Sequence, residues 1–169
     1  MKLEYADDLR RTVPAVSRAL ASLLDDDARR RPAPGKWSTK EIVGHLVDSA
    51  ANNHQRFVRA QFQDDLMFAG YAQDDWVAAQ RYQEAEWPAL VGLWRDYNLH
   101  LARVMEAIPE DVRLRERRRH NLHELAWRAV AEDLPTTLDY FMRDYVEHLH
   151  HHVRQISAMG IDVRAEPTV

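Results

Sequence analysis

The residues best suited to chemistry are the histidines near the C-terminal end of the chain. The sequence has nine histidines, and four of them lie in the short tract from position 148 to 152. If this tract is helical, His148 and His152 lie about 40° apart on one face. His150 then points to nearly the opposite side, and His151 lies on the flank. A histidine pair at this spacing can offer two nitrogens to one metal ion.

The same helical face is polar on both sides of the pair. Gln155 lies about 20° from the direction of His148, and Asp144 lies one turn earlier. The remaining positions of this helix provide apolar side chains for burial. Polar groups on a buried stripe need partners, and a metal ion is one way to provide them.

Two histidines do not complete a transition-metal site, and His45 is the candidate third ligand. It lies among apolar residues of a predicted helix, with Asp48 three positions later and Arg56 within about 20° of its direction. Three imidazoles leave a coordination position open, as in catalytic sites, and suit zinc, nickel, copper or iron. The alternative is that His45 is a hydrogen-bonded packing residue. A surface or structural role is predicted for His54, His100, His120 and His123.

The composition excludes several classes of protein. No cysteine is present, which excludes disulfides, thiolate metal sites, iron–sulfur clusters and a cysteine nucleophile. The formal net charge of −4 and the pI near 6.1 argue against a nucleic-acid binder. No apolar stretch has the length of a signal peptide or a membrane span. We therefore expect a cytoplasmic protein with no nucleic-acid or membrane partner.

The elements that position these residues are predicted to be helices. Length and composition fit one domain over residues 1–169. Four long helices and two short ones are predicted, the long ones over residues 3–26, 38–63, 87–108 and 137–159, and the short ones near 74 and over 121–131. Residues 111–119 are expected to form a solvated charged loop. The predicted fold is an all-α four-helix bundle with additional short helices.

Local signals mark several helix ends. Ser38 and Glu41 have the spacing of a capping box, so a helix is expected to begin there. Thr136 is the predicted N-cap of the last helix, and Gly160 lies where its C-cap belongs. Pro14 is expected to kink or restart the first helix.

Two segments resemble the DinB/YfiT-like family of metalloenzymes. The first runs from Gly35 to Ser49, GKWSTKEIVGHLVDS, and continues through Asn52 to Arg56 and Phe57. The second is DYVEHLHHHVRQI, residues 144–156. The two segments are about a hundred residues apart, and the resemblance covers almost the whole chain in order and spacing.

This resemblance implies a four-helix bundle with an unusual connection order, often as a homodimer. It also implies a divalent metal, commonly nickel or zinc, held by one histidine of the second long helix and two of the last. By position these ligands are His45, His148 and His152, the same three that helical geometry selects. Some members of the family have an extra histidine where this chain has Gln155.

Thiol chemistry is the first functional hypothesis. Several members of the family transfer or isomerise through low-molecular-weight thiols such as bacillithiol, mycothiol or glutathione. The chain is therefore expected to catalyse thiol-dependent S-transfer to a small electrophilic substrate, with the metal favouring the thiolate. Small thiol cofactors carry carboxylates, and Arg56 is the candidate residue to bind them. Arg143 and Arg154 are weaker candidates, and the basic run 113–119 is more simply a solvated loop.

Two alternatives remain open. The first is a metal-dependent hydrolase that uses a metal-bound water. Asp48 is then the best candidate for the general base, although orientation of a metal ligand is the favoured role for its carboxylate. The second is a non-catalytic metal-binding or dimerisation domain.

Overall fold

The computed structural model describes residues 3–163 and confirms the all-α fold. This part of the chain contains eight α-helices and two short 3-10 helices. The α-helices are α1 (Glu4–Ala21), α2 (Asp25–Arg29), α3 (Thr39–Arg59), α4 (Gln73–Ala79), α5 (Trp87–Ala107), α6 (Glu110–Leu114), α7 (Leu122–Leu125) and α8 (Leu138–Ala158). The 3-10 helices are η1 (Ala60–Phe62) and η2 (Tyr82–Glu84).

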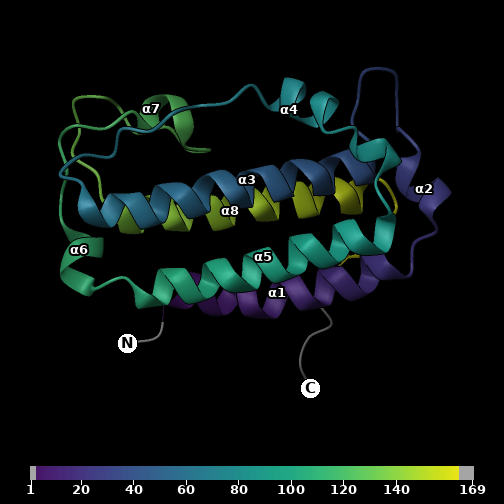
Figure 1. Ribbon diagram of the computed structural model, residues 1–169, viewed down its shortest axis with the longest axis horizontal. Coiled ribbons are helices and arrows are strands. Elements are labelled where there is room, and N and C mark those ends of the chain that lie inside the picture. The colour runs from purple at the N-terminus through teal and green to yellow at the C-terminus, as the bar shows by residue number, and fades with distance from the viewer. Residues whose placement is uncertain (1–2, 164–169) are drawn as a thin grey trace.

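The four long helices form the bundle (Figure 1). α3 and α8 lie side by side in one layer, and α1 and α5 lie side by side in the other. α3 also packs on α5, which joins the two layers. The short helices lie in the connections, with α4 between α3 and α5, and α6 and α7 between α5 and α8. This arrangement places α3, the helix that carries the candidate third ligand His45, directly beside the histidine tract of α8.

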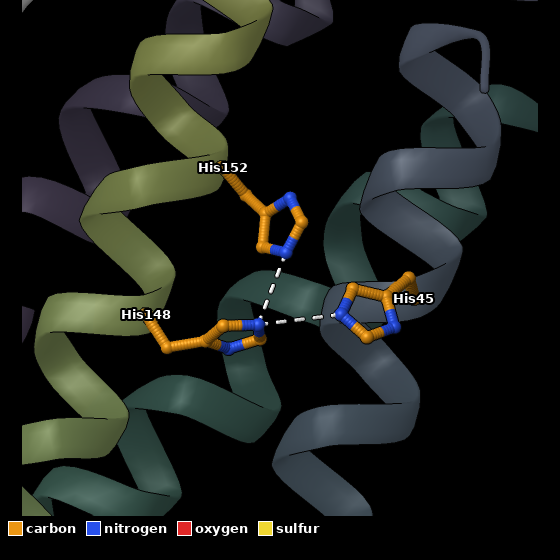
Figure 2. A group of neighbouring side chains, drawn as sticks. All are labelled: His45, His148 and His152. Atoms are coloured by element: carbon orange, nitrogen blue, oxygen red, sulfur yellow. Dashed lines mark hydrogen bonds between the residues drawn. The ribbon is translucent and has the colours of Figure 1, made fainter. Parts of the chain in front are cut away.

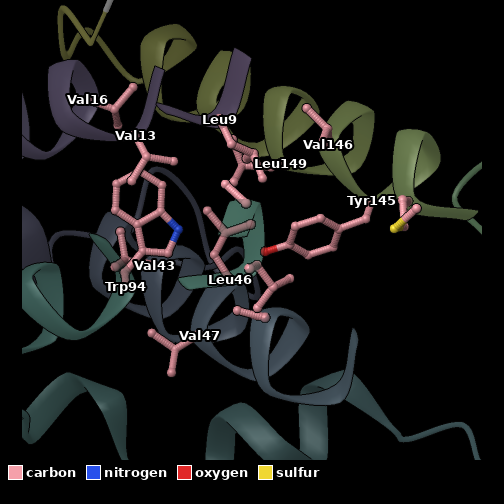
Figure 3. Close-up of a cluster of buried hydrophobic side chains, with 14 of the residues drawn as sticks. Leu9, Val13, Val16, Val43, Leu46, Val47, Trp94, Tyr145, Val146 and Leu149 are labelled. Atoms are coloured by element: carbon pink, nitrogen blue, oxygen red, sulfur yellow. The ribbon is translucent and has the colours of Figure 1, made fainter. Parts of the chain in front are cut away.

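The apolar faces of the long helices meet in one core (Figure 3). The labelled core residues come from all four long helices: Leu9, Val13 and Val16 from α1, Val43, Leu46 and Val47 from α3, Trp94 from α5, and Tyr145, Val146 and Leu149 from α8. Trp94 is fully buried, and the indole N–H of Trp87 donates to the Leu20 carbonyl at 3.0 Å. No helix in residues 3–163 is long and apolar enough to cross a membrane.

The capping box predicted at the start of α3 is present. The backbone N–H of Glu41 donates to the Ser38 hydroxyl at 3.2 Å, and the Ser38 N–H donates to the Glu41 carboxylate at 2.9 Å. These two bonds satisfy amide groups that the first turn of a helix leaves free. The helix then runs past Gly44 to Arg59 without interruption. The box therefore sets where His45 lies along α3.

The first helix is shorter than predicted. α1 ends at Ala21, where the hydroxyl of Ser22 donates to the Ala19 carbonyl at 2.7 Å and competes with the helical pattern. Leu24, beyond the end of α1, is 72% exposed. Pro14 lies inside α1 and neither ends nor restarts it.

The prediction of a solvated loop over residues 111–119 is only partly correct, because most of these residues are exposed but the segment includes helical and buried residues. α6 covers the first part, and Arg113 and Arg117 are buried. Arg113 forms an ion pair with Asp139 of α8. Arg117 donates at 3.1 Å to the carbonyl of Ala60, just beyond the end of α3. Free carbonyl groups at a helix end attract such a donor, and a partner 57 positions away is invisible to a local charge pattern.

The helix predicted over residues 121–131 is reduced to α7. Beyond Leu125, the backbone N–H groups of Trp127 and Arg128 donate to the Asp144 carboxylate at 2.8 and 2.7 Å. These amides therefore bond to α8 instead of continuing their own helix.

The last long helix begins one residue later than predicted. Its N-cap is Thr137, whose side chain accepts from the N–H of Tyr140 at 3.0 Å. Thr136 instead exchanges two backbone hydrogen bonds with Arg117. The end agrees with the prediction, because Gly160 has a φ of 87°, the left-handed region that favours glycine.

Gly44 allows a close neighbour to lie against α3. A Cβ at this position would overlap the ring of Tyr82. The hydroxyl of Tyr82 donates at 2.7 Å to Asp48, one turn further along the helix. Because position 44 has no side chain, the Tyr82 ring of η2 can pack directly against α3.

We predict that Gly44→Ala lowers the free energy of unfolding by about 1–3 kcal/mol, because Tyr82 must move to relieve the overlap. Gly92→Ala in α5 is the matched control, since a Cβ there meets no atom within 4 Å. Alanine is expected to stabilise that helix by up to about 1 kcal/mol. Urea unfolding measures both. An unchanged free energy in Gly44→Ala would contradict the packing described.

Candidate metal centre

His45 of α3 faces His148 and His152 of α8 across the interface between these helices (Figure 2). The Nε2 atom of His148 lies 3.5 Å from Nε2 of His45 and 3.0 Å from Nε2 of His152. One nitrogen from each ring lies within 4.8 Å of the other two. The structure thus brings together the three histidines that helical spacing and the family resemblance single out.

Burial keeps these three imidazoles neutral. His45 and His152 are 2% and 7% exposed, and His148 is partly buried. Burial, and then the neighbouring His152, lower the pKa of His45 to about 3. Burial and the surrounding histidines lower the pKa of His148 to about 3. Burial lowers the pKa of His152 to about 4. Neutral imidazole is the form that binds metal ions.

A hydrogen bond on the outer side of His152 directs the lone pair of its inner nitrogen into the cluster. Nδ1 of His152 lies 2.8 Å from Oε1 of Gln155. Because an amide oxygen only accepts, the ring proton lies on Nδ1 and the Nε2 lone pair faces the other rings. If the Nε2–H of His148 donates to that lone pair, Nε2 of His148 has no lone pair left to accept a hydrogen bond from His45. Hydrogen bonds alone leave one contact unsatisfied, whereas a divalent transition metal accepts all three lone pairs, so these residues fit such an ion.

The cluster opens onto a cavity of about 420 Å³. His45 and His148 form part of its wall, and the rest comes from α3, α8 and the two long connections. A volume of this size is typical of small-molecule sites. The arrangement can therefore hold a small ligand against two of the three imidazoles.

Asp48 does not lie where a general base is needed. It is absent from the cavity wall, and one carboxylate oxygen accepts from the Tyr82 hydroxyl at 2.7 Å and from the Gln80 amide at 2.6 Å. Burial raises the pKa of this carboxyl group. No hydrogen bond joins it to His45 within the described residues. The structure therefore does not support Asp48 as a base or as the residue that orients His45.

Arg56 is the predicted basic residue that reaches the cavity. It lies on the wall, on the same side of α3 as His45. The weaker candidates do not line the cavity: Arg143 is exposed and packs over the ring of Tyr5, and Arg154 is exposed.

Sequence reasoning missed Trp127 as a part of this site. Its ring lies 4.2 Å from the ring of His151 and 5.8 Å from that of His148, between centroids. It also lines the cavity, as does Tyr71 from the connection before α4. Trp127 lies beyond the end of α7 and Tyr71 lies in a connection, so no periodicity within one helix marks either residue. Asp144, noted beside the histidine pair, holds the Trp127 segment.

The other histidines occupy structural or surface positions. His150 points away from the cluster and lies 2.5 Å from the Asp8 carboxylate of α1. His54 contacts the hydroxyl of Tyr97 at 3.3 Å. His120 is buried and lies 2.8 Å from a backbone carbonyl.

Metal binding is expected to require the three clustered histidines. We predict that untagged protein binds about one zinc or nickel ion per chain, and that the triple variant His45→Ala, His148→Ala and His152→Ala binds none. Elemental analysis after dialysis measures both. The matched control changes three histidines outside the cluster, His54, His100 and His123, to alanine. Equal metal content in the clustered variant and the wild type would contradict the site.

Gln155 is expected to strengthen metal binding without contacting the ion. Gln155→Ala removes the acceptor that holds the His152 proton on Nδ1, and we predict about 10-fold to 100-fold weaker zinc affinity. Gln155→Glu keeps an acceptor at the same place and should bind zinc at least as tightly as the wild type. Competition with a chromophoric chelator measures the affinities. Equal affinity in Gln155→Ala and the wild type would show that this hydrogen bond does not matter.

Comparison with solved structures places the fold. The chain is similar to YfiT from Bacillus subtilis, a probable metal-dependent hydrolase with an unusual four-helix bundle topology, with a TM-score of 0.75 and 17% identity over 93% of this chain and 84% of that one. It is also similar to the mycothiol-dependent maleylpyruvate isomerase, with a TM-score of 0.59 and 15% identity, over 98% of this chain. It spans 61% of the length of that isomerase. No curated protein sequence matches the chain.

These similarities show the fold, which is the four-helix bundle topology of YfiT. The sequence pattern of the DinB superfamily matches residues 8–156, and this range includes the three clustered histidines. The chain therefore belongs to the DinB superfamily.

Proposed function

We propose that this protein is a metal-dependent enzyme that joins a small thiol cosubstrate to a small electrophile. The observation that carries the proposal is the cluster of three buried, neutral imidazoles, two of which line a cavity of small-molecule size. His45, His148 and His152 would hold a divalent ion, nickel or zinc. When bound, this ion would supply Lewis acidity that favours the thiolate form of the cosubstrate.

The thiol must come from a small molecule, because the chain has no cysteine. The structural likeness to a mycothiol-dependent enzyme supports this choice. In the reaction, the thiol sulfur bonds to the electrophilic carbon and the leaving group departs with its electron pair. The thiol proton passes to solvent, so the products are a thioether and the acid of the leaving group.

The cavity wall provides groups suited to this reaction. Burial, with the nearby Asp48 charge, raises the pKa of Tyr71 to about 12, so its hydroxyl stays protonated and can donate to a leaving group. Phe141 and Trp127 form apolar parts of the wall. They would cover apolar parts of a bound substrate.

Metal-dependent hydrolysis is the second candidate, and Asp144 is the observation that favours it. This carboxylate is 5% exposed and lines the same cavity as His45 and His148. Burial raises its pKa, although it accepts two backbone hydrogen bonds. A carboxyl group with a raised pKa is suited to exchange protons with water.

Activity assays separate the two candidates. With zinc or nickel bound, we expect turnover of a chlorinated aromatic electrophile only in the presence of a thiol such as bacillithiol, mycothiol or glutathione. His148→Ala should lose activity by at least about 100-fold, and His123→Ala should retain it. Turnover of an ester or amide without added thiol would favour hydrolysis. A lack of activity in both assays would contradict both proposed reactions. The remaining hypothesis would then be a non-catalytic metal-binding domain.

A further inference from the structure

Arg56 is a buried cation without a carboxylate partner. Its side chain is 7% exposed, although it lies in the last turns of α3. No Asp or Glu within residues 3–163 forms an ion pair with it. Burial without such a partner lowers the pKa of Arg56. A buried charge is costly unless something compensates it.

The protein uses only part of the hydrogen-bonding capacity of this guanidinium. Nη2 donates to the Ala69 carbonyl at 2.8 Å, and Nη1 makes a long contact of 3.5 Å with Oδ1 of Asn53. The guanidinium carbon lies 6.0 Å from the centre of the Phe141 ring. Arginine has five N–H donors. The Nε–H donates to no described residue and is not sealed in protein, because no Arg56 nitrogen is both buried and unbonded.

Two other buried arginines show how this fold otherwise satisfies a guanidinium. Arg113 pairs with the Asp139 carboxylate. Arg117 donates to three backbone carbonyl groups through its two Nη atoms, although its Nε is buried without a partner, and it lies outside the cavity wall. Arg56 has no carboxylate partner and only one backbone carbonyl, and it lines the cavity. Its free donors therefore face a space that a ligand can enter.

The two carboxylates on the cavity wall do not neutralise Arg56. Both oxygens of Asp144 accept backbone N–H groups, from Trp127 and Arg128. The side chain of Glu124 is 66% exposed and lies near His123. Their negative charges nevertheless disfavour a dianion in the cavity. A singly charged planar group, the carboxylate, best matches a guanidinium in these surroundings.

We propose that Arg56 binds the carboxylate of a small molecule in this cavity and directs the reactive end of that molecule toward His45 and His148. The chemistry at the reactive end rests on the proposed function, but carboxylate binding by Arg56 does not. The carboxylate belongs either to the thiol cosubstrate or to the electrophile.

The spacing along α3 sets the shape of the occupant. His45 and Arg56 point to the same side of the helix, and their backbone positions are about 16 Å apart along its axis. Both side chains line the cavity, with Ser49 and Asn53 on the wall between them. A molecule that reaches from one to the other has its charged group and its reactive group at opposite ends.

Calorimetric titration tests the binding with a matched pair of probes, 3-mercaptopropionate and the neutral 3-mercapto-1-propanol. Wild-type protein should prefer the carboxylate by about 10-fold or more, the effect of one charge-assisted hydrogen-bonded pair. Arg56→Met should lose this preference and bind the neutral probe as the wild type does. Arg59→Met, which removes an exposed arginine of the same helix, should keep it. Equal binding of both probes by the wild type, or an intact preference in Arg56→Met, overturns the inference.

A second variant guards against misfolding. Arg56→Gln is neutral but keeps an N–H donor for the Ala69 carbonyl, and it too should lose the preference. Circular dichroism melting checks the fold of each variant. Retained preference in a folded Arg56→Gln variant also overturns the inference.

Turnover then identifies which molecule carries the carboxylate. In one arm, 3-mercaptopropionate reacts with chloroacetamide, and in the other 3-mercapto-1-propanol reacts with chloroacetate. Arg56→Met should lower kcat/KM most in the arm whose carboxylate Arg56 binds, and less with the fully neutral pair, 3-mercapto-1-propanol with chloroacetamide. Arg59→Met should leave kcat/KM unchanged in every arm. An equal loss with the neutral pair contradicts a carboxylate role.

Failure of this inference is distinguishable from failure of the proposed function. The titrations are made on zinc-loaded and on chelator-treated protein, and zinc content is measured for each variant. Bound zinc without a carboxylate preference overturns only the role of Arg56. A carboxylate preference in protein that binds no zinc overturns only the metal centre.

Discussion

Three histidine rings are withdrawn from water where α3 meets α8, and the rest of the site follows from that desolvation. It holds the rings in their uncharged form and leaves their nitrogens poorly satisfied by the protein. One hydrogen bond, from His152 to Gln155, assigns a proton to the outer nitrogen of its ring. The continuous apolar core behind α3 and α8 stabilises an interface that polar groups alone would weaken.

The two helices and the connections have different tasks in the cavity. α3 places the His45 imidazole and the Arg56 guanidinium along one side, whereas α8 supplies the His148 imidazole and the Asp144 carboxylate. The connections before α4 and around α7 supply Tyr71 and Trp127. Rigid helices thus hold the charged and ligating groups, and the connections shape the remaining space. Differences in substrate between members of such a fold are expected to arise mainly in the connections.

The parts of the molecule that could be predicted are those governed by geometry within one helix. The spacing of His148 and His152, the placement of His45 and the capping box at Ser38 all depend on neighbours within a few positions. The parts that could not be predicted depend on distant partners. Examples are Arg117, which bonds to a carbonyl near the end of α3, and Trp127, whose backbone bonds to α8. Asp48 shares a helix with His45, but Tyr82, held close because residue 44 is glycine, takes its carboxylate.

The backbone N–H groups of Trp127 and Arg128 donate to Asp144. These bonds join one part of the cavity wall to α8, the helix that carries two of the three imidazoles. Movement of the Trp127 segment away from α8 must break these two hydrogen bonds, since the Asp144 carboxylate lies one turn before His148 on that helix. The part of the cavity wall that Trp127 forms is therefore tied to the same helix as His148 and His152.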